Sequence, residues 1–133
     1  LYGPSFDGQR GATDSLRILA ERQEEYGIFT DEWRTPMAVA DAARGLVDLA
    51  LDWSVTGIRH LFGPRRLSRW ELALEIAKAE GLDPAGFRKA SRLDLPGPER
   101  PRDTSLRTRF GRPLHGEKSA SAPGPHSGTE ASS

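Results

Sequence analysis

Residues 67–81, LSRWELALEIAKAEG, carry the clearest structural signal in the chain. Ser68 and Glu71 have the spacing of a capping box, in which each side chain accepts a backbone N–H that the helix start would otherwise leave unpaired. Leu67 and Leu72 are placed as the hydrophobic staple around this box. Gly81 suits the left-handed residue that ends many helices. We therefore predict a helix that begins after Ser68 and ends at Gly81. The residues that we expect it to bury are Leu72, Ala73, Ile76 and Ala77.

Two more helices are predicted upstream. The first spans residues 13–26, with Thr13 or Asp14 as its cap and Gly27 as its end, and its thin apolar stripe predicts a surface helix. The second runs from about residue 42 to residue 51 behind Asp41 as a cap. Its apolar residues recur at helical spacing, so we expect one of its faces to be well buried.

Short apolar runs predict strands at residues 28–30, 37–39, 57–62 and 87–92. Strands therefore alternate with helices, which is typical of an α/β fold. A short helix is expected after Thr104, and the Ser/Gly/Pro-rich residues 115–133 have the composition of a disordered tail.

The composition excludes several classes of protein. The 133 residues hold 19 Lys+Arg against 19 Asp+Glu, which argues against a nucleic-acid or membrane-surface binder. There is no cysteine, so no disulfide or thiolate site is present, and a cytoplasmic setting is expected. The chain opens on Leu1-Tyr2-Gly3-Pro4, which resembles a strand end entering a loop. We interpret this as a fragment of a larger protein; a trimmed but otherwise complete chain is the alternative.

No complete catalytic constellation is found. The sequence has neither a glycine-rich dinucleotide fingerprint nor a phosphate-binding P-loop. A tyrosine acid with a lysine four residues later is also absent, since Tyr2 is followed there by Phe6 and Tyr26 by Thr30. His60 is interpreted as an ordinary, partly buried histidine, and no metal site is expected.

Two loops have residue types suited to a ligand. In residues 30–36, Asp31, Trp33 and Arg34 would suit a ligand with hydroxyls, a ring and a phosphate. A surface turn with an Asp–Arg pair is the alternative. In residues 100–105, a proline-stiffened loop carries arginines and hydroxyls that would suit a diphosphate, and a solvated basic loop is the alternative.

Five segments follow one another in a familiar order: LYGP (1–4), FTDEWRTPMAVADAA (29–43), GIRHLFGP (57–64), LSRWELA (67–73) and RPRDTSL (100–106). In this order they resemble the second half of an extended short-chain dehydrogenase/reductase, in the dTDP-4-dehydrorhamnose reductase branch of the NAD-dependent epimerase/dehydratase superfamily. Each segment alone is only moderately specific, and the resemblance rests on their joint order and spacing over about residues 1–114.

The resemblance implies a Rossmann sheet that binds NAD(P) and a small mixed αβ lobe that binds a nucleotide sugar. Residues 1–12 would then end the Rossmann part, 13–114 would form the substrate lobe, and 115–133 would be the tail. Tyr2 and Gly3 would lie near the cofactor, whereas the glycine fingerprint and the Tyr/Lys pair would lie upstream. The implied substrate-binding residues are Arg34 and Arg102, with Asp31, Trp33, Thr104 and Ser105 as weaker assignments.

On this reading the chain carries no catalytic residue and binds no NAD or NADP by itself. The intact protein would reduce or epimerise a nucleotide sugar and is compatible with a homodimer. Members of the family also serve as non-catalytic regulatory subunits, so a binding module of the same fold remains the alternative.

Overall fold

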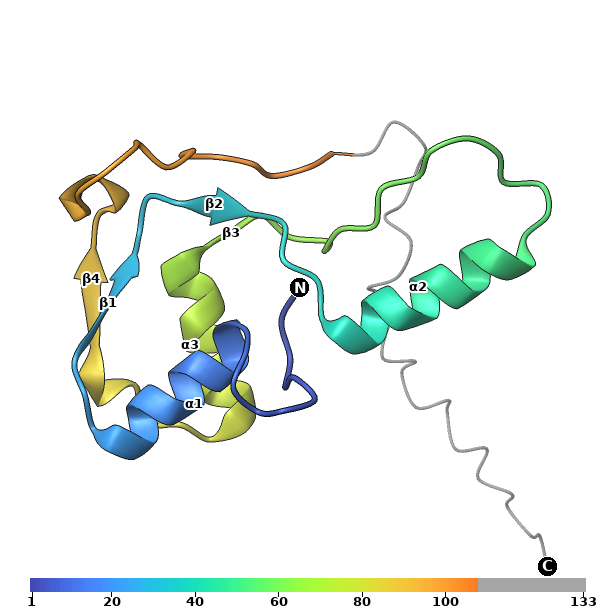
Figure 1. Ribbon diagram of the computed structural model, residues 1–133. Coiled ribbons are helices and arrows are strands. Elements are labelled where there is room, and N and C mark those ends of the chain that lie inside the picture. The colour runs from blue at the N-terminus through green and yellow to red at the C-terminus, as the bar shows by residue number, and fades with distance from the viewer. Residues whose placement is uncertain (108–133) are drawn as a thin grey trace, which may run out of the picture.

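A computed structural model describes residues 1–107, which form three α-helices, two short 3₁₀ helices and four short strands (Figure 1). The helices are α1 (Ala12–Arg22), α2 (Val39–Leu51) and α3 (Arg69–Glu80). The strands are β1 (Tyr26–Phe29), β2 (Trp33–Arg34), β3 (Leu67–Ser68) and β4 (Phe87–Ala90). The 3₁₀ helices are Pro84–Gly86 and Arg92–Asp94. The described chain is thus a small mixed α/β fold, as the alternation of patterns predicted.

The strands form two separate pairs. β1 and β4 are parallel, in a register that places Tyr26 opposite Phe87 and Phe29 opposite Ala90. β2 and β3 are antiparallel, with Trp33 opposite Ser68. The strands predicted at 28–30 and 87–92 are confirmed as β1 and β4, with their ends shifted.

The core lies where α1 and α3 pack against the β1–β4 pair. Its buried residues are Leu16, Ile28, Ala73, Ile76, Ala77 and Phe87. The helix predicted from residues 67–81 is confirmed: Glu71 N–H donates to the Ser68 hydroxyl at 3.1 Å, and Ser68 N–H donates to the Glu71 carboxylate at 2.7 Å. Gly81 ends it in the left-handed region, with φ 67°. Of the four residues expected to be buried, Leu72 is only partly so.

The predicted ends of the first helix were wrong. Thr13 and Asp14 do not cap α1; they are buried inside its first turn. The Thr13 hydroxyl accepts from the Gly3 N–H at 3.0 Å, and the Asp14 carboxylate accepts from the Ser5 N–H at 3.1 Å. These side chains hold the N-terminal segment instead of the helix start. The helix ends at Gln23, with φ 52°, three residues before β1 begins.

Two of the four predicted strands are absent from the described structure. Residue 38 makes only an isolated bridge to Tyr2, and α2 begins immediately afterwards at Val39. Asp41 lies in the first turn of α2 and pairs with Arg44 instead of capping the helix. Residues 57–62 form no strand, because no strand in the described part of the chain lies beside them to complete the backbone hydrogen bonds.

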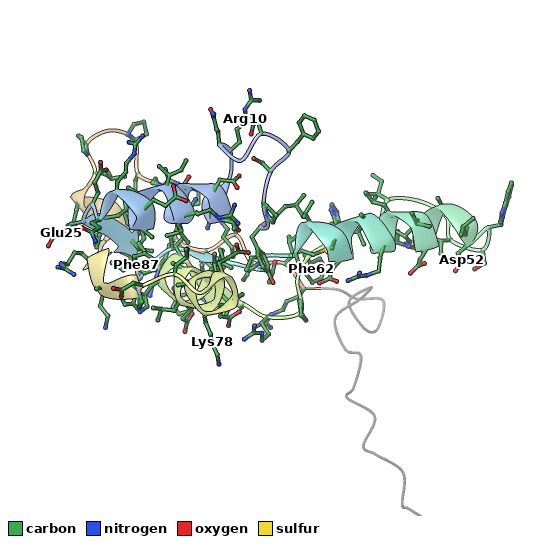
Figure 2. The ribbon with its side chains drawn as sticks, turned by 90° about the horizontal axis from the view of Figure 1, so that it is seen from below. Arg10, Glu25, Asp52, Phe62, Lys78 and Phe87 are labelled. Atoms are coloured by element: carbon green, nitrogen blue, oxygen red, sulfur yellow. The ribbon has the colours of Figure 1, made fainter. Side chains whose placement is uncertain are left out.

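The prediction that one face of α2 is well buried was also wrong. Figure 2 shows α2 extending away from the rest of the described chain. Leu46 is 60% exposed and Val47 is 56% exposed, and the only buried residues of the helix are Ala42 and Gly45. The pattern indicated correctly that a helix forms, but not what lies against it.

No helix follows Thr104 as far as Arg107. The remainder of the lobe predicted to reach residue 114, and the tail predicted at 115–133, lie outside the described residues.

Candidate functional site

The two loops that the sequence singled out lie side by side. Trp33 N–H donates to the Arg102 carbonyl at 2.8 Å, and Thr104 N–H donates to the Trp33 carbonyl at 3.2 Å. Trp33 and Asp103 thereby form a parallel bridge. Residues 102–104 follow one edge of β2 and β3 follows the other, as the orange trace beside β2 shows in Figure 1. Segments about 70 residues apart in sequence therefore share one surface.

Glu32, immediately before β2, is the centre of this surface. Its side chain is fully buried, with 0% exposure. The carboxylate accepts from Arg69 Nε at 2.6 Å and Arg34 Nη2 at 3.0 Å through one oxygen, and from Arg100 Nε at 2.9 Å through the other. The Glu32 carbonyl also accepts the Arg69 backbone N–H at 3.0 Å. One carboxylate thus joins β2, the start of α3 and the loop at residue 100.

The arginines keep this buried carboxylate charged. Burial acts to raise the pKa of Glu32, because a charged group loses its hydration inside the protein. Hydrogen bonds from Arg100 and Arg69, and the positive charges around them, outweigh burial and hold the pKa below its ordinary value. The same hydrogen bond raises the pKa of Arg100. At neutral pH the centre of the surface is therefore an ionised cluster.

A second group of charged side chains lies on Trp33. The guanidinium of Arg66 stacks over the indole, with its carbon 4.0 Å from the ring centroid. Arg66 also donates to the Asp103 carboxylate from Nε at 2.9 Å and from Nη2 at 2.8 Å. Hydrogen bonds from Ser105, together with Arg66, hold the pKa of Asp103 far below its ordinary value. Arg66 therefore occupies one face of the Trp33 indole, which is then closed to a ligand ring.

Positive charge is in excess on this surface. Four arginines, Arg34, Arg66, Arg69 and Arg100, donate to its two carboxylates, Glu32 and Asp103, and a fifth, Arg102, joins the surface through its backbone carbonyl. Since the whole chain has a formal net charge of zero, this surplus is a local feature. We call these seven residues the arginine cluster. An arrangement of fixed guanidinium groups with surplus charge can bind an oxyanion.

The structure places the remaining candidate residues differently. Asp31 lies outside the arginine cluster, where its carboxylate accepts from Ser91 Oγ at 2.7 Å and from the Arg92 N–H at 2.9 Å. These two donors lower the pKa of Asp31 and occupy the acceptors expected to meet ligand hydroxyls. Thr104 and Ser105 belong to the bridging segment and contribute backbone hydrogen bonds there.

Tyr2 and Gly3, expected near a cofactor, have no hydrogen bond to the cluster. The Tyr2 backbone bonds to Met37 at 3.0 Å and to Val39 at 2.8 Å, while Gly3 bonds to Thr13. The two residues therefore join the N-terminal segment to α1 and to the start of α2.

Five members of the cluster are absent from the substrate-binding residues that the resemblance implies: Glu32, Arg66, Arg69, Arg100 and Asp103. Arg66 and Arg69 lie beside Ser68 of a capping box, where the local pattern assigns them to solvent, whereas Arg100 belongs to the loop whose arginines would suit a diphosphate. In the sequence, Glu32 is one acidic residue within a charged turn, and nothing in its neighbours predicts that it is buried. One usable signal existed: Glu32 and Arg34 are two residues apart across β2, which places both on one face of an extended segment.

Residues 1–107 contain no group of three or more His, Cys, Asp or Glu side chains that could hold a metal ion. In the same part of the chain, no helix has the length and apolar character needed to cross a membrane. The sequence matches no protein-family model and no curated protein.

Proposed function

We propose that this chain is the nucleotide-sugar-binding part of an NAD(P)-dependent oxidoreductase similar to the dTDP-4-dehydrorhamnose reductases. The observation that carries the proposal is the arginine cluster, which forms where the two predicted binding loops meet. A nucleotide sugar carries a diphosphate, a base and hydroxyls. The cluster offers guanidinium groups for the diphosphate, and the partly buried indole of Trp33 beside it offers a ring for the base.

The resemblance implies that Arg102 and Arg34 bind the substrate. The proposal keeps Arg102 as a phosphate contact and Arg34 as a secondary one, because both terminal nitrogens of Arg34 already donate within the protein. Arg102 is exposed, and no side-chain hydrogen bond or ion pair within residues 1–107 engages its guanidinium. Arg34 lies on β2 beside it, across the backbone hydrogen bond from Trp33 to Arg102. Both positions suit a diphosphate that lies along this edge.

Under this proposal, this chain binds the substrate and a separate Rossmann part carries the catalytic residues. Neither a glycine fingerprint nor a Tyr-x-x-x-Lys pair occurs in the 133 residues. Hydride and proton transfer would therefore depend on a Rossmann part outside this sequence, which would bind NADP or NAD in the cytoplasm. Within the proposal this chain binds and orients the substrate, and a homodimer of the intact protein is compatible with it.

A non-catalytic binding or regulatory module is the second candidate, because the sequence contains no catalytic pair of its own. The coding sequence upstream of Leu1 separates the two. A reading frame that continues back through a Tyr-x-x-x-Lys pair and a glycine-rich turn supports the oxidoreductase. A frame that lacks both supports the binding module.

Calorimetric titration of the chain with dTDP-glucose tests the proposal. We expect saturable binding that weakens as salt is added, no binding of thymidine, and weaker binding by Arg102→Ala. The loss should be about tenfold or more, because a charge-assisted hydrogen bond contributes roughly 1.5–3 kcal/mol. A folded chain that produces no binding heat with dTDP-glucose would refute the proposal. Cofactor fluorescence should detect no NADPH binding by the chain alone.

A further inference from the structure

We infer that Glu32 is a positioning residue for anion binding, and that the arginines it holds, Arg69 and Arg100, are the principal phosphate-binding groups. Neither arginine is among the substrate-binding residues that the resemblance implies, although Arg100 belongs to the loop at 100–105 whose arginines would suit a diphosphate. The inference takes its ligand class, a phosphoryl group, from the proposed function. It rests on which guanidinium nitrogens Glu32 engages and which it leaves free.

Glu32 holds both arginines by the same edge. Arg69 and Arg100 each donate to the carboxylate through Nε, at 2.6 Å and 2.9 Å. Most N–H donors of a guanidinium are on its two terminal nitrogens, not on Nε. No hydrogen bond within residues 1–107 engages the terminal nitrogens of either arginine, and their side chains are 45% and 42% exposed. Both therefore present free donors at the protein surface.

The two guanidinium groups are also close neighbours. Their Nε atoms contact the two oxygens of a single carboxylate, although Arg69 begins α3 and Arg100 lies in a loop. Two positive charges that share one carboxylate repel each other, and the negative charge between them offsets this repulsion. Glu32 supplies that charge. Because its carboxylate is shielded from solvent, the arrangement exists before any ligand arrives, which lowers the cost of ordering side chains on binding.

The backbone of Arg69 is also held in a defined position. Its backbone N–H donates to the Glu32 carbonyl at 3.0 Å, and it lies between Ser68 and Glu71, the two residues of the capping box of α3. Arg34 differs, because its Nη1 donates to the Trp33 carbonyl at 2.7 Å and its Nη2 to Glu32 at 3.0 Å. Both terminal nitrogens of Arg34 are thus engaged within the protein. The principal phosphate contact accordingly shifts from Arg34 to Arg69 and Arg100.

The substitution Glu32→Gln separates positioning from simple charge. Removing a negative charge makes the surface more positive, so Coulomb attraction alone predicts tighter anion binding. If Glu32 positions the arginines, its loss lets them separate, and anion binding weakens despite the added positive charge. The sign of the change in affinity therefore distinguishes the two explanations.

The experiment is calorimetric titration of the chain with inorganic pyrophosphate and, separately, with dTDP-glucose. We expect Glu32→Gln, Arg69→Gln and Arg100→Gln each to weaken pyrophosphate binding by about tenfold or more. Arg88→Gln is the matched control, since Arg88 is a half-exposed arginine paired with Glu25 alone among carboxylates; it should stay within about twofold. Tighter pyrophosphate binding by folded Glu32→Gln would overturn the inference.

Lysine substitutions keep the test decisive if Glu32→Gln fails to fold. Arg69→Lys and Arg100→Lys preserve the charge, but a single ammonium group cannot present the guanidinium's separate edges to Glu32 and to a phosphate. We expect both to bind pyrophosphate about tenfold more weakly, with near-ultraviolet circular dichroism confirming the native fold. Native affinity in both lysine variants would overturn the inference.

The two ligands separate this inference from the proposed function. If pyrophosphate binding depends on Glu32, Arg69 and Arg100 but dTDP-glucose binds no more tightly than pyrophosphate, the positioning role stands and the nucleotide-sugar assignment fails. If dTDP-glucose binding needs Arg102 but is indifferent to Arg69 and Arg100, the proposed function stands and this inference fails. If neither ligand binds the folded chain, both fail.

Discussion

Replacing Glu32 with glutamine tests the stability of the arginine cluster as well as its binding. The substitution keeps the shape of the side chain but removes the charge that three arginines share at 2.6, 2.9 and 3.0 Å. Breaking a fully buried ion pair costs roughly 3–5 kcal/mol. The three arginines are partly exposed and can recover hydration, and the glutamine oxygen can still accept a hydrogen bond. We therefore expect a loss of about 2 kcal/mol in the free energy of unfolding.

Urea denaturation followed by tryptophan fluorescence measures this loss at neutral pH. For a domain of this size, about 2 kcal/mol is a substantial part of the expected total stability. Glu75→Gln is the control, because Glu75 pairs with Arg65 at the surface, where such pairs contribute little. The slope of the denaturation curve should stay unchanged if the native fold is retained.

The difference in free energy of unfolding between the parent and Glu32→Gln should depend on pH in a defined direction. The pKa of Glu32 is lowered in the folded state, so its stabilisation is present above the ordinary glutamate pKa and is lost as pH falls through the lowered folded value. The gap between the parent and Glu32→Gln should therefore shrink below about pH 4. A loss under about 1 kcal/mol at neutral pH, or an equal gap at neutral and strongly acidic pH, would refute this account of Glu32.

Three further substitutions test the fold. Leu46→Asn on α2 should change the free energy of unfolding by no more than about 0.5 kcal/mol, because Leu46 is exposed, and a loss above about 2 kcal/mol in urea would show that the face is covered. Gly3→Ala should lower the melting temperature, since Gly3 has φ 128° and an added Cβ would lie 2.8 Å from Val39 Cγ1; an unchanged melting curve would contradict this geometry. Ser68→Ala removes the capping box of α3 and should cost about 1 kcal/mol by denaturation, whereas a change near zero would mean that the box contributes nothing.

The predictions that held concern interactions within a few residues. Ser68 and Glu71 satisfy each other's backbone N–H groups across one turn, so the start of α3 follows from the sequence. Gly81 ends the same helix because a left-handed residue is easiest for glycine. The apolar runs of β1 and β4 also identified two strands, although only the structure shows that they pair in parallel.

The predictions that failed depended on distant partners. Thr13 and Asp14 are good caps by residue type, yet they accept hydrogen bonds from the backbone N–H groups of Gly3 and Ser5 in the N-terminal segment. Leu46 and Val47 fall on an apolar stripe, which indicates a face without revealing what covers it. Residues 57–62 have strand-like composition, but a strand forms only where another supplies its hydrogen bonds.

For the candidate site, the sequence by itself determined which two loops carry ligand-binding residue types and that the whole chain is electrically neutral. Only the tertiary structure decided that these loops lie side by side, and that Arg34, Arg69 and Arg100 meet on one buried carboxylate. Residue type and spacing express what a side chain can do within its own turn or strand. Glu32 meets Arg69 from 37 residues away and Arg100 from 68 residues away. These contacts form only when the core of α1, α3, β1 and β4 packs and brings the segments together.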